Sequence, residues 1–543
     1  MRTVMFDTLV YGNIYTMDLR KPEAEVLGIK DGKIQFCGTR RAASLLKAKR
    51  TLDFRGKTIL PGFIDTHVHV IPAGIFMKGA DLSKAKTVSD VLDLLRENAG
   101  KTAPKDWILG AYFQDKLIAE KRFPTKEELD AVSKDRPVLI CHNDLHPIAF
   151  NTKALEILKV RPDKPGVITD ENGEMTGQVE DPGCVDMLGD ILAKMGIASI
   201  LDGIFLVDDY AAAHGVTTVF GKDVLDILLL REIAKDLFKI EFVPMWYSDG
   251  CRDLASLEKF LKNKMFAGRA CVCAFADGAF DGHSAALAEP YTDRPDTKGI
   301  LNYSDEEMYA FTMTAHRAGA QVSFHAIGDA AVDQVLRVYE RVLADCPRED
   351  HRLRIEHFEE PTKEAIEKAA SLRVALSMQP LLLEVCEKMD FSGYAGFIGD
   401  RVLRCSPYRS VLDHGLLVGG GTDFPVTPMD VLHGAKIAMT HPVESERITL
   451  QECLEMNTSE AAKLGFLENR KGRLAFGLDA DFIVLDQDPY AVETDALDGI
   501  KIEKTFRGGR CVFDAEDRKP HKKRSLPGVL LRIAGKKLRL PVG

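Results

Sequence analysis

The sequence lacks the features of a membrane or secreted protein. No window approaches the ~20 uninterrupted apolar residues of a membrane-spanning helix. The N-terminal stretch, MRTVMFDTLVYGNIYTMD, has neither the long apolar core nor the small-residue cleavage site of a signal peptide. The formal net charge of −10 favours solubility and argues against a general nucleic-acid binder. We therefore expect a cytoplasmic protein with no membrane and no nucleic-acid partner.

The sequence also lacks the cysteine pattern of a disulfide framework or a zinc finger. The eleven cysteines are odd in number and scattered through apolar segments such as RACVCAF, which holds Cys271 and Cys273. Disulfide frameworks are typical of small secreted chains, and no second cysteine pair lies at zinc-site spacing. Most of the cysteines are therefore predicted to be buried and reduced.

The two ends of the chain are rich in short strands. Asp31-Gly32 lies between two alternating runs in VLGIKDGKIQFCG, which predicts a β-hairpin. Similar strand patterns, broken by Gly and Asp, recur near the other end in KGRLAFGLDADFIVLDQDP and IEKTFRGGRCVFD. We predict that residues 1–60 and 465–520 together form a small β-sandwich domain.

The middle of the chain alternates strand-like apolar runs with helix-like stretches. DEEMYAFTMTAHRAG, which ends at Gly319, is one of these stretches. This alternation is typical of a βα barrel. The fold class predicted for residues 61–440 is α/β, a (β/α)₈ TIM barrel, with strands at 62–70, 215–220, 242–247, 271–278, 321–328, 352–358, 373–380 and 416–426.

Two segments do not fit the alternation. Residues from about 71 to 200 are too many for one βα unit and contain a strand of their own, 136–144, so we predict an insertion above the barrel mouth. The tail, 521–543, carries seven Lys/Arg and no acid. This tail is either solvated or in contact with another subunit, for example in a homodimer. The alternative is that it is attracted to an acidic surface.

Histidines and one aspartate follow the predicted strands. His67 and His69 are two apart on the first strand, so their side chains share a face and can reach one metal. His325, His357 and Asp423 come at the ends of the fifth, sixth and eighth strands. Because active sites of such barrels collect at the carboxyl ends of the strands, we predict that these five residues bind a metal.

Four motifs carry a resemblance to a known family: PGFIDTHVHV, HAIGD (325–329), RIEH (354–357) and GGTDFPV (420–426). They resemble the amidohydrolase superfamily. FPTKEELDAVSKDRPV, SMQP and KGRLAFGLDADFIVLD are similar to its amidohydrolase 3 branch, which is YtcJ-like and includes N-substituted formamide deformylases. The likeness covers all but the basic tail. It implies a metal-dependent hydrolase acting on a small-molecule substrate, with a barrel and a composite β-sandwich domain.

The sequence departs from that branch in three places. Relatives have a carboxylated, metal-bridging lysine in the fourth strand, where alignment on Asp277-Gly278 places Cys273. Cys273 is either a thiolate ligand or a small core residue beside a single metal. Phe220 and Gly221 replace a His-Asp pair after the second strand, and His283 replaces an arginine.

The resemblance also indicates residues that could contact the substrate. A polar cluster of His142, Asn143, Asp144 and His146 lies in and just beyond the predicted strand of the insertion. These residues could either contact the substrate or make structural hydrogen bonds, and the sequence favours neither alternative. The motifs GQVED, Asp277-Gly278 and SMQP contain further candidates. The predicted substrate-binding residues are His142, Asp144, His146, Glu180, Asp277, His283 and Gln379.

The predicted chemistry follows from the ligands. One or two divalent ions, zinc being favoured by imidazole and thiolate, would lower the pKa of water toward ~7. Asp423 would act as general base and then acid, and His325 would help to polarise the carbonyl. Hydrolysis of an amide-like C–N bond is the leading prediction. The alternatives are isomerisation or decarboxylation on the same scaffold, and a metal-free binding protein that kept the fold.

Overall fold

The computed structural model describes residues 5–142, 147–180, 183–223, 228, 231–232, 235–247, 251–264, 266, 271–385 and 392–517. By its internal contacts the chain divides into two compact units. The first comprises 1–68, 209–423 and 427–543, and the second comprises 69–208 and 424–426. The basic tail, 521–543, lies outside the described residues.

The first unit contains the predicted barrel. Eight strands form one sheet in the order β18-β17-β16-β15-β14-β13-β12-β5, every described pair is parallel, and β18 contacts β5 so that the sheet nearly closes. The eight predicted strands are thus confirmed. Their bounds are β5 Phe63–Val68, β12 Val216–Asp223, β13 Glu241–Tyr247, β14 Cys271–Phe275, β15 Gln321–Ala326, β16 Arg354–His357, β17 Ala375–Met378 and β18 Leu417–Gly420.

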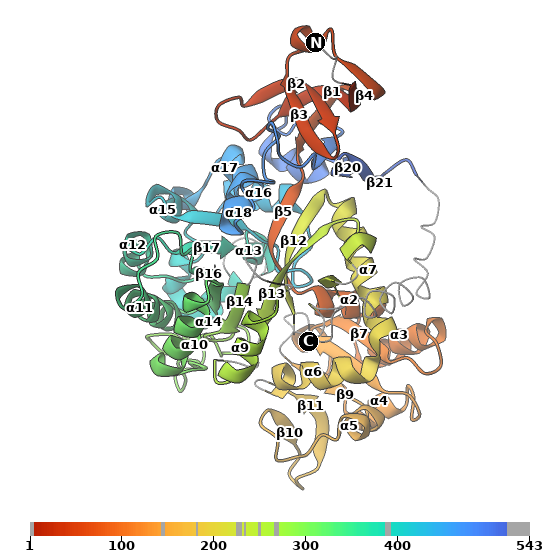
Figure 1. Ribbon diagram of the computed structural model, residues 1–543. Helices are drawn as coiled ribbons and strands as arrows, with labels where there is room; N and C mark the ends of the chain where they lie inside the picture. Colours follow the sequence, from red (N-terminus) through yellow and green to blue (C-terminus); the bar gives the residue numbers. More distant parts are fainter. Residues whose placement is uncertain are drawn as a thin grey trace. The chain divides into compact units, whose positions relative to one another are not determined.

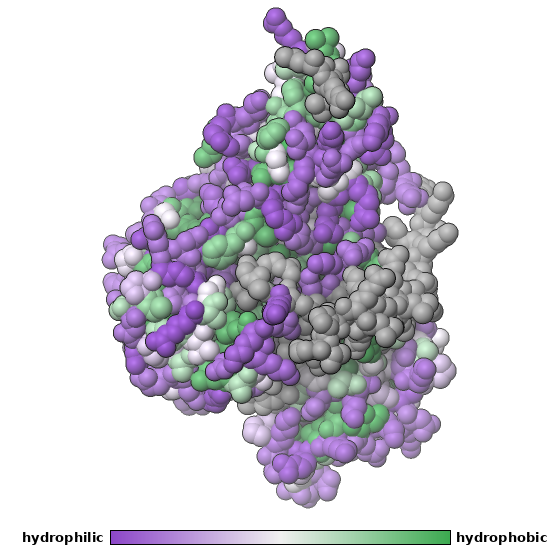
Figure 2. Space-filling model, viewed as in Figure 1, coloured by the Kyte–Doolittle hydropathy of each residue, from purple (hydrophilic) through white to green (hydrophobic). Residues whose placement is uncertain are grey.

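Amphipathic helices cover the outside of the barrel (Figure 1). In α11, Val332, Val335, Leu336 and Tyr339 are buried, and the face shown in Figure 2 is mostly hydrophilic over the barrel helices. The predicted helix before Gly319 is α10, which begins at a Ser304–Glu307 capping box. The helices are α9 Leu254–Leu261, α10 Asp305–Arg317, α11 Asp329–Asp345, α12 Lys363–Ser371, α13 Leu382–Val385, α14 Ser392–Ile398, α15 Tyr408–Asp413, α16 Val431–Met439, α17 Leu450–Met456 and α18 Ser459–Leu464.

The ends of the chain form a composite β-domain. Its seven strands lie in the order β21-β20-β19-β4-β1-β2-β3. Ile34 of β3 and Phe506 of β20 share one apolar cluster although their strands lie near opposite edges, so the sheet curves around a common core, as a sandwich does. The bounds are β1 Met5–Tyr15, β2 Glu23–Lys30, β3 Lys33–Gly38, α1 Arg40–Ala43, β4 Lys47–Pro61, β19 Phe482–Leu485, β20 Ile502–Arg507 and β21 Arg510–Asp514.

The hairpin predicted at Asp31-Gly32 is confirmed, because β2 and β3 pair antiparallel around these two residues. Asp31 and Gly32 both have positive φ, 51° and 74°. A two-residue turn with two positive φ angles matches the twist of the strands that it joins.

The second unit covers the residues predicted as an insertion, about 71 to 200, and has a core of its own that includes Val91, Ile108 and Val138. Its sheet has the order β10-β11-β9-β8-β7-β6, and the strand predicted at 136–144 is β8. The bounds are α2 Val70–Lys78, β6 Ala80–Asp81, α3 Val88–Lys101, β7 Ile108–Phe113, α4 Lys126–Asp130, β8 Val138–His142, β9 Ile148–Phe150, α5 Thr152–Leu158, β10 Val167–Thr169, β11 Met175–Val179 and α6 Gly183–Met195, and α7 Ile197–Ala213 leads back to the first unit.

Candidate metal centre

Three of the predicted ligands converge at the carboxyl ends of the barrel strands. His67, His357 and Asp423 are buried, and one potential donor atom from each lies within 4.8 Å of the others, the one such group within the described ranges. His67 Nε2 lies 3.1 Å from Asp423 Oδ1, and the ring centroids of His67 and His357 are 4.8 Å apart. Two imidazoles and a carboxylate are a typical donor set for a divalent transition metal.

His357 is in the protonation state that a metal ligand requires. Burial lowers the pKa of His357 to about 3, so this imidazole is neutral at pH 7. Its buried Nδ1 makes no hydrogen bond to any described residue. A buried ring nitrogen that is neutral and has no hydrogen bond fits a metal ligand, since only the neutral ring offers a lone pair.

Local backbone geometry brings His357 and Asp423 into this group. His357 has φ of 70° and Asp423 has φ of 57°, both in the left-handed region that residues other than glycine rarely adopt. Adjacent residues of an extended strand point to opposite faces. The left-handed turn at the end of β16 instead lets Glu356 and His357 contribute to the same centre, and such conformations concentrate at functional sites.

Glu356 fixes the orientation of His67. Glu356 Oε2 lies 2.7 Å from His67 Nδ1, and Arg354 Nε lies 2.6 Å from Glu356 Oε1. Burial opposes ionisation of Glu356, but the charges of Arg354 and Lys222 and the contact with His67 hold its pKa well below the usual value. An ionised carboxylate can only accept, so His67 Nδ1 carries the proton and Nε2 presents its lone pair.

Lys222, which the sequence analysis did not single out, reaches this centre from the end of β12. Its side chain is buried, and its Nζ lies 2.9 Å from His67 Nε2 and 5.3 Å from the centroid of the Phe275 ring. Lys222 directly follows Phe220-Gly221, where the sequence departs from its relatives. That departure was the one feature of the sequence that pointed to Lys222. Glu356 lies inside the motif RIEH, but its role at this centre depends on the left-handed turn at His357, which the motif does not reveal.

Two further predicted ligands are buried in the barrel but lie outside the group of three. His325 Nε2 is 3.1 Å from the carbonyl oxygen of Gly278, and its ring packs against His357 with centroids 4.5 Å apart. Cys273, on β14, belongs to an apolar cluster with Ile64. Burial raises the pKa of its thiol to about 12, so in the metal-free protein it is a neutral thiol.

His69 and the residues of the insertion belong to the second unit. His69 is half buried at the start of α2 and is not part of the group of three. His142 lies 3.5 Å from Asp115. Glu180 is exposed and accepts a hydrogen bond from Gln178 at 2.9 Å. Asp144 and His146 lie outside the described residues.

The remaining substrate candidates have partners within the protein. Asp277 accepts hydrogen bonds from the backbone N–H groups of Ala286 and Gly328, both at 2.9 Å. His283 Nε2 lies 2.8 Å from Asp293 Oδ2. The amide of Gln379 donates to the Ser377 carbonyl at 2.9 Å, while its buried Oε1 makes no hydrogen bond within the described part of the chain. Gln379 is therefore the candidate that retains a buried acceptor.

The fold and this centre define a (β/α)₈ barrel that collects histidines and carboxylates at its carboxyl strand ends. The amidohydrolase family model matches residues 50–513, and the chain belongs to this family. YtcJ of Bacillus subtilis (strain 168), named as an amidohydrolase, is 28% identical over 93% of this chain and 98% of its own. The N-substituted formamide deformylase of Arthrobacter pascens is 26% identical over 92% and 97%.

The same fold is found in a solved structure. An uncharacterized metal-dependent hydrolase from Pyrococcus horikoshii OT3 matches with a TM-score of 0.76 and 24% identity, over 90% of this chain and 99% of that one. Family membership supports a hydrolase, which agrees with the predicted class. No described helix is both long enough and apolar enough to cross a membrane.

Proposed function

We propose that this protein is a metal-dependent hydrolase that cleaves an amide-like C–N bond of a small molecule. The observation that carries the proposal is the buried group of His67, His357 and Asp423, whose donor atoms lie within 4.8 Å of one another. The neutral His357 and the orientation of His67 by Glu356 both suit a divalent ion, and zinc is favoured by the imidazole ligands. His69, His325 and Cys273 remain proposed as further ligands.

The protein's own residues suggest how the reaction is divided. A divalent ion in this centre would supply an activated water and polarise the scissile carbonyl. Asp423 is the carboxylate of the group, so we assign it the proton transfer from the attacking water to the leaving nitrogen. We assign assistance at the carbonyl oxygen to His325, because its ring packs against His357. Glu356 would keep the proton of His67 on Nδ1.

The substrate class is supported by a relative that covers nearly the whole chain. The deformylase of Arthrobacter pascens matches over 92% of this sequence, and its name describes the cleavage of an N-substituted formamide. His283 and the Phe220-Gly221 pair differ from the residues of that branch, so we propose an amide other than a simple formamide. The cytoplasmic location and the homodimer stay predictions.

The test combines metal analysis with isotope labelling. Protein reconstituted with zinc, manganese or iron is incubated with N-acyl, N-formyl and cyclic amides in H₂¹⁸O, and products are analysed by mass spectrometry. We expect one ¹⁸O in the product carboxylate and no turnover after metal removal. A product isomeric with its substrate, or one that has lost CO₂ without taking up water, would contradict hydrolysis and favour the non-hydrolytic alternative.

Ligand variants connect the reaction to the centre. We expect His67→Ala and His357→Ala each to lower bound metal and turnover together, whereas His351→Ala should leave both unchanged. His351 is a suitable control because it is a buried histidine whose Nε2 lies 3.0 Å from the carbonyl oxygen of Leu372, outside the donor group. Full metal content in both ligand variants would overturn the assignment.

A further inference from the structure

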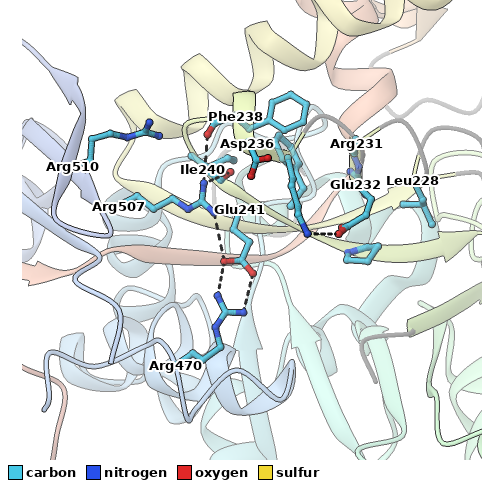
Figure 3. Close-up of a pocket in the computed structure, with 13 residues that line it drawn as sticks. Leu228, Arg231, Glu232, Asp236, Phe238, Ile240, Glu241, Arg470, Arg507 and Arg510 are labelled. Carbon is cyan, nitrogen blue, oxygen red and sulfur yellow. Dashed lines mark hydrogen bonds and ion pairs between the residues drawn. The ribbon is translucent and has the colours of Figure 1, made fainter. Parts of the chain in front are cut away.

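A second cavity, of about 460 Å³, lies at the opposite end of the barrel strands (Figure 3). It opens beside Glu241, the first residue of β13, and is bordered by β20 and β21 of the β-domain. The metal centre lies at the carboxyl ends of the strands. Strand β13 has seven residues, and at ~3.3 Å per residue the two sites are separated by roughly 20 Å. The cavity is therefore a site distinct from the metal centre.

Three arginines from the C-terminal part of the chain border this cavity. Figure 3 shows Arg507 and Arg510 to one side of Glu241 and Arg470 below it. Arg470 contacts both carboxylate oxygens of Glu241, at 3.3 and 3.0 Å. Arg507 donates to the carbonyl oxygen of Ile240 at 3.1 Å. The exposed guanidinium of Arg510 has no hydrogen bond or ion pair to the described residues.

Glu241 does not by itself balance the cations around it. Burial would raise the pKa of Glu241, but the charges of Lys471, Arg470 and Arg507 lower it to about 2, so one carboxylate is surrounded by several cations. The lining includes five basic and three acidic side chains, and two of the basic ones, Arg231 and Arg470, also pair with Asp223 and Asp479 outside the lining. Among the described residues, Arg510 is the lining cation that has no carboxylate partner. An anion would be attracted to the side of the cavity where Arg507 and Arg510 lie.

The barrel side of the same cavity combines apolar residues with the charged side chains of 231–236. Five apolar residues line it, and Phe238 and Phe242 pack edge to face with ring centroids 4.9 Å apart. Small-molecule sites commonly combine an apolar wall with a few polar groups that set the orientation of the ligand. The apolar residues of the lining are Leu228, Phe238, Ile240, Phe242 and Pro244.

We propose that this cavity binds a small organic anion, with an aromatic or aliphatic body against the apolar wall and a phosphate or carboxylate group between Arg507 and Arg510. Guanidinium groups suit both anions because their N–H donors match two oxygens at once. The proposal does not depend on the proposed function, since binding is measured without turnover and without metal.

The test measures binding of phenyl phosphate, benzoate, inorganic phosphate and benzyl alcohol to the full chain by calorimetry. Phenyl phosphate supplies both the body and the anion, and benzyl alcohol supplies the body alone. We expect phenyl phosphate or benzoate to bind more tightly than either inorganic phosphate or benzyl alcohol. Comparing the first two ligands shows whether the site prefers phosphate or carboxylate.

Charge reversal locates the ligand. Arg510→Glu should weaken binding about tenfold or more, as expected when a charge-assisted hydrogen bond is lost. Arg41→Glu is the matched control, because Arg41 is also exposed on the β-domain but does not line the cavity. Equal affinity in wild type and Arg510→Glu, no binding of either aromatic anion, or benzyl alcohol binding as tightly as the anions would overturn the proposal.

Discussion

Lys222 and a metal ion would compete for the lone pair on His67 Nε2. His67 Nδ1 is held by Glu356 at 2.7 Å, so Nε2 has the one lone pair of the ring. The ammonium of Lys222 lies 2.9 Å from Nε2. A metal bound through His67 must therefore displace this ammonium. We predict that Lys222→Met, which keeps a long side chain but removes the charge and the N–H donors, tightens metal binding.

The size of the effect can be worked out from these contacts. A hydrogen bond to or from a charged group contributes about 1.5–3 kcal/mol, which corresponds to roughly 10- to 100-fold in the metal dissociation constant. Repulsion between the ammonium and a divalent ion acts in the same direction. The Phe275 ring, whose centroid is 5.3 Å from Nζ, offers the displaced ammonium a cation–π partner and reduces the cost. We therefore expect a change near tenfold.

The assay is a competition titration of zinc against a chromophoric chelator at constant pH. Lys471→Met serves as the control, since it also removes a buried ammonium, which lies 3.2 Å from Glu241 at the far end of β13. Weaker metal binding in Lys222→Met would refute the competition argument. If intact wild-type protein also carried one extra CO₂ that the variant lacked, Lys222 would be a carboxylated ligand instead.

Three further predictions concern individual side chains. Asp423→Asn should keep part of the metal but lower turnover roughly a hundredfold, as for a lost proton shuttle; near-normal turnover would contradict the general-base role. If Cys273 is a ligand, X-ray absorption should show a metal–sulfur distance of about 2.3 Å. Cys273→Ala and Cys273→Ser should then both lower metal occupancy. A first coordination shell of only nitrogen and oxygen would instead indicate that Cys273 is a packed core residue. Burial raises the pKa of Asp277 to about 7 in the folded protein, whereas an unfolded aspartate has a pKa of ~3.9. The protonated form therefore stabilises the fold fully below pH ~3.9, and this stabilisation is lost as the pH rises through 7. Asp277→Asn should therefore reduce the pH dependence of the unfolding free energy between about pH 4 and 7, measured by denaturant titration, and identical slopes would contradict this assignment.

The barrel could be predicted because its strands are buried on both faces. A strand such as CVCAF or QVSFHA reads as an apolar run, with helix signals on either side. The hairpin at Asp31-Gly32 was equally visible because two positive φ angles favour this pair of residues. These are local signals, and the structure confirms them.

The contacts inside the barrel could not be predicted in the same way. His67 and Glu356 are 289 residues apart, and Lys222 is 155 residues from His67. No periodicity shows which inward side chains meet across a barrel. The left-handed turn at His357 also breaks the alternation that strand patterns assume, so Glu356 and His357 could not both be assigned to one site from spacing alone.

Cys273, one of the sequence departures, has Lys222 as a neighbour in the barrel interior. The family resemblance implies a lysine at the position of Cys273 on β14, and Lys222 enters the same interior from β12. After burial, the charge of Lys222 has the next largest effect on the pKa of the Cys273 thiol, which places the two side chains near each other. A buried ammonium is costly without a counter-charge, and Glu356, whose pKa Lys222 helps to lower, provides one.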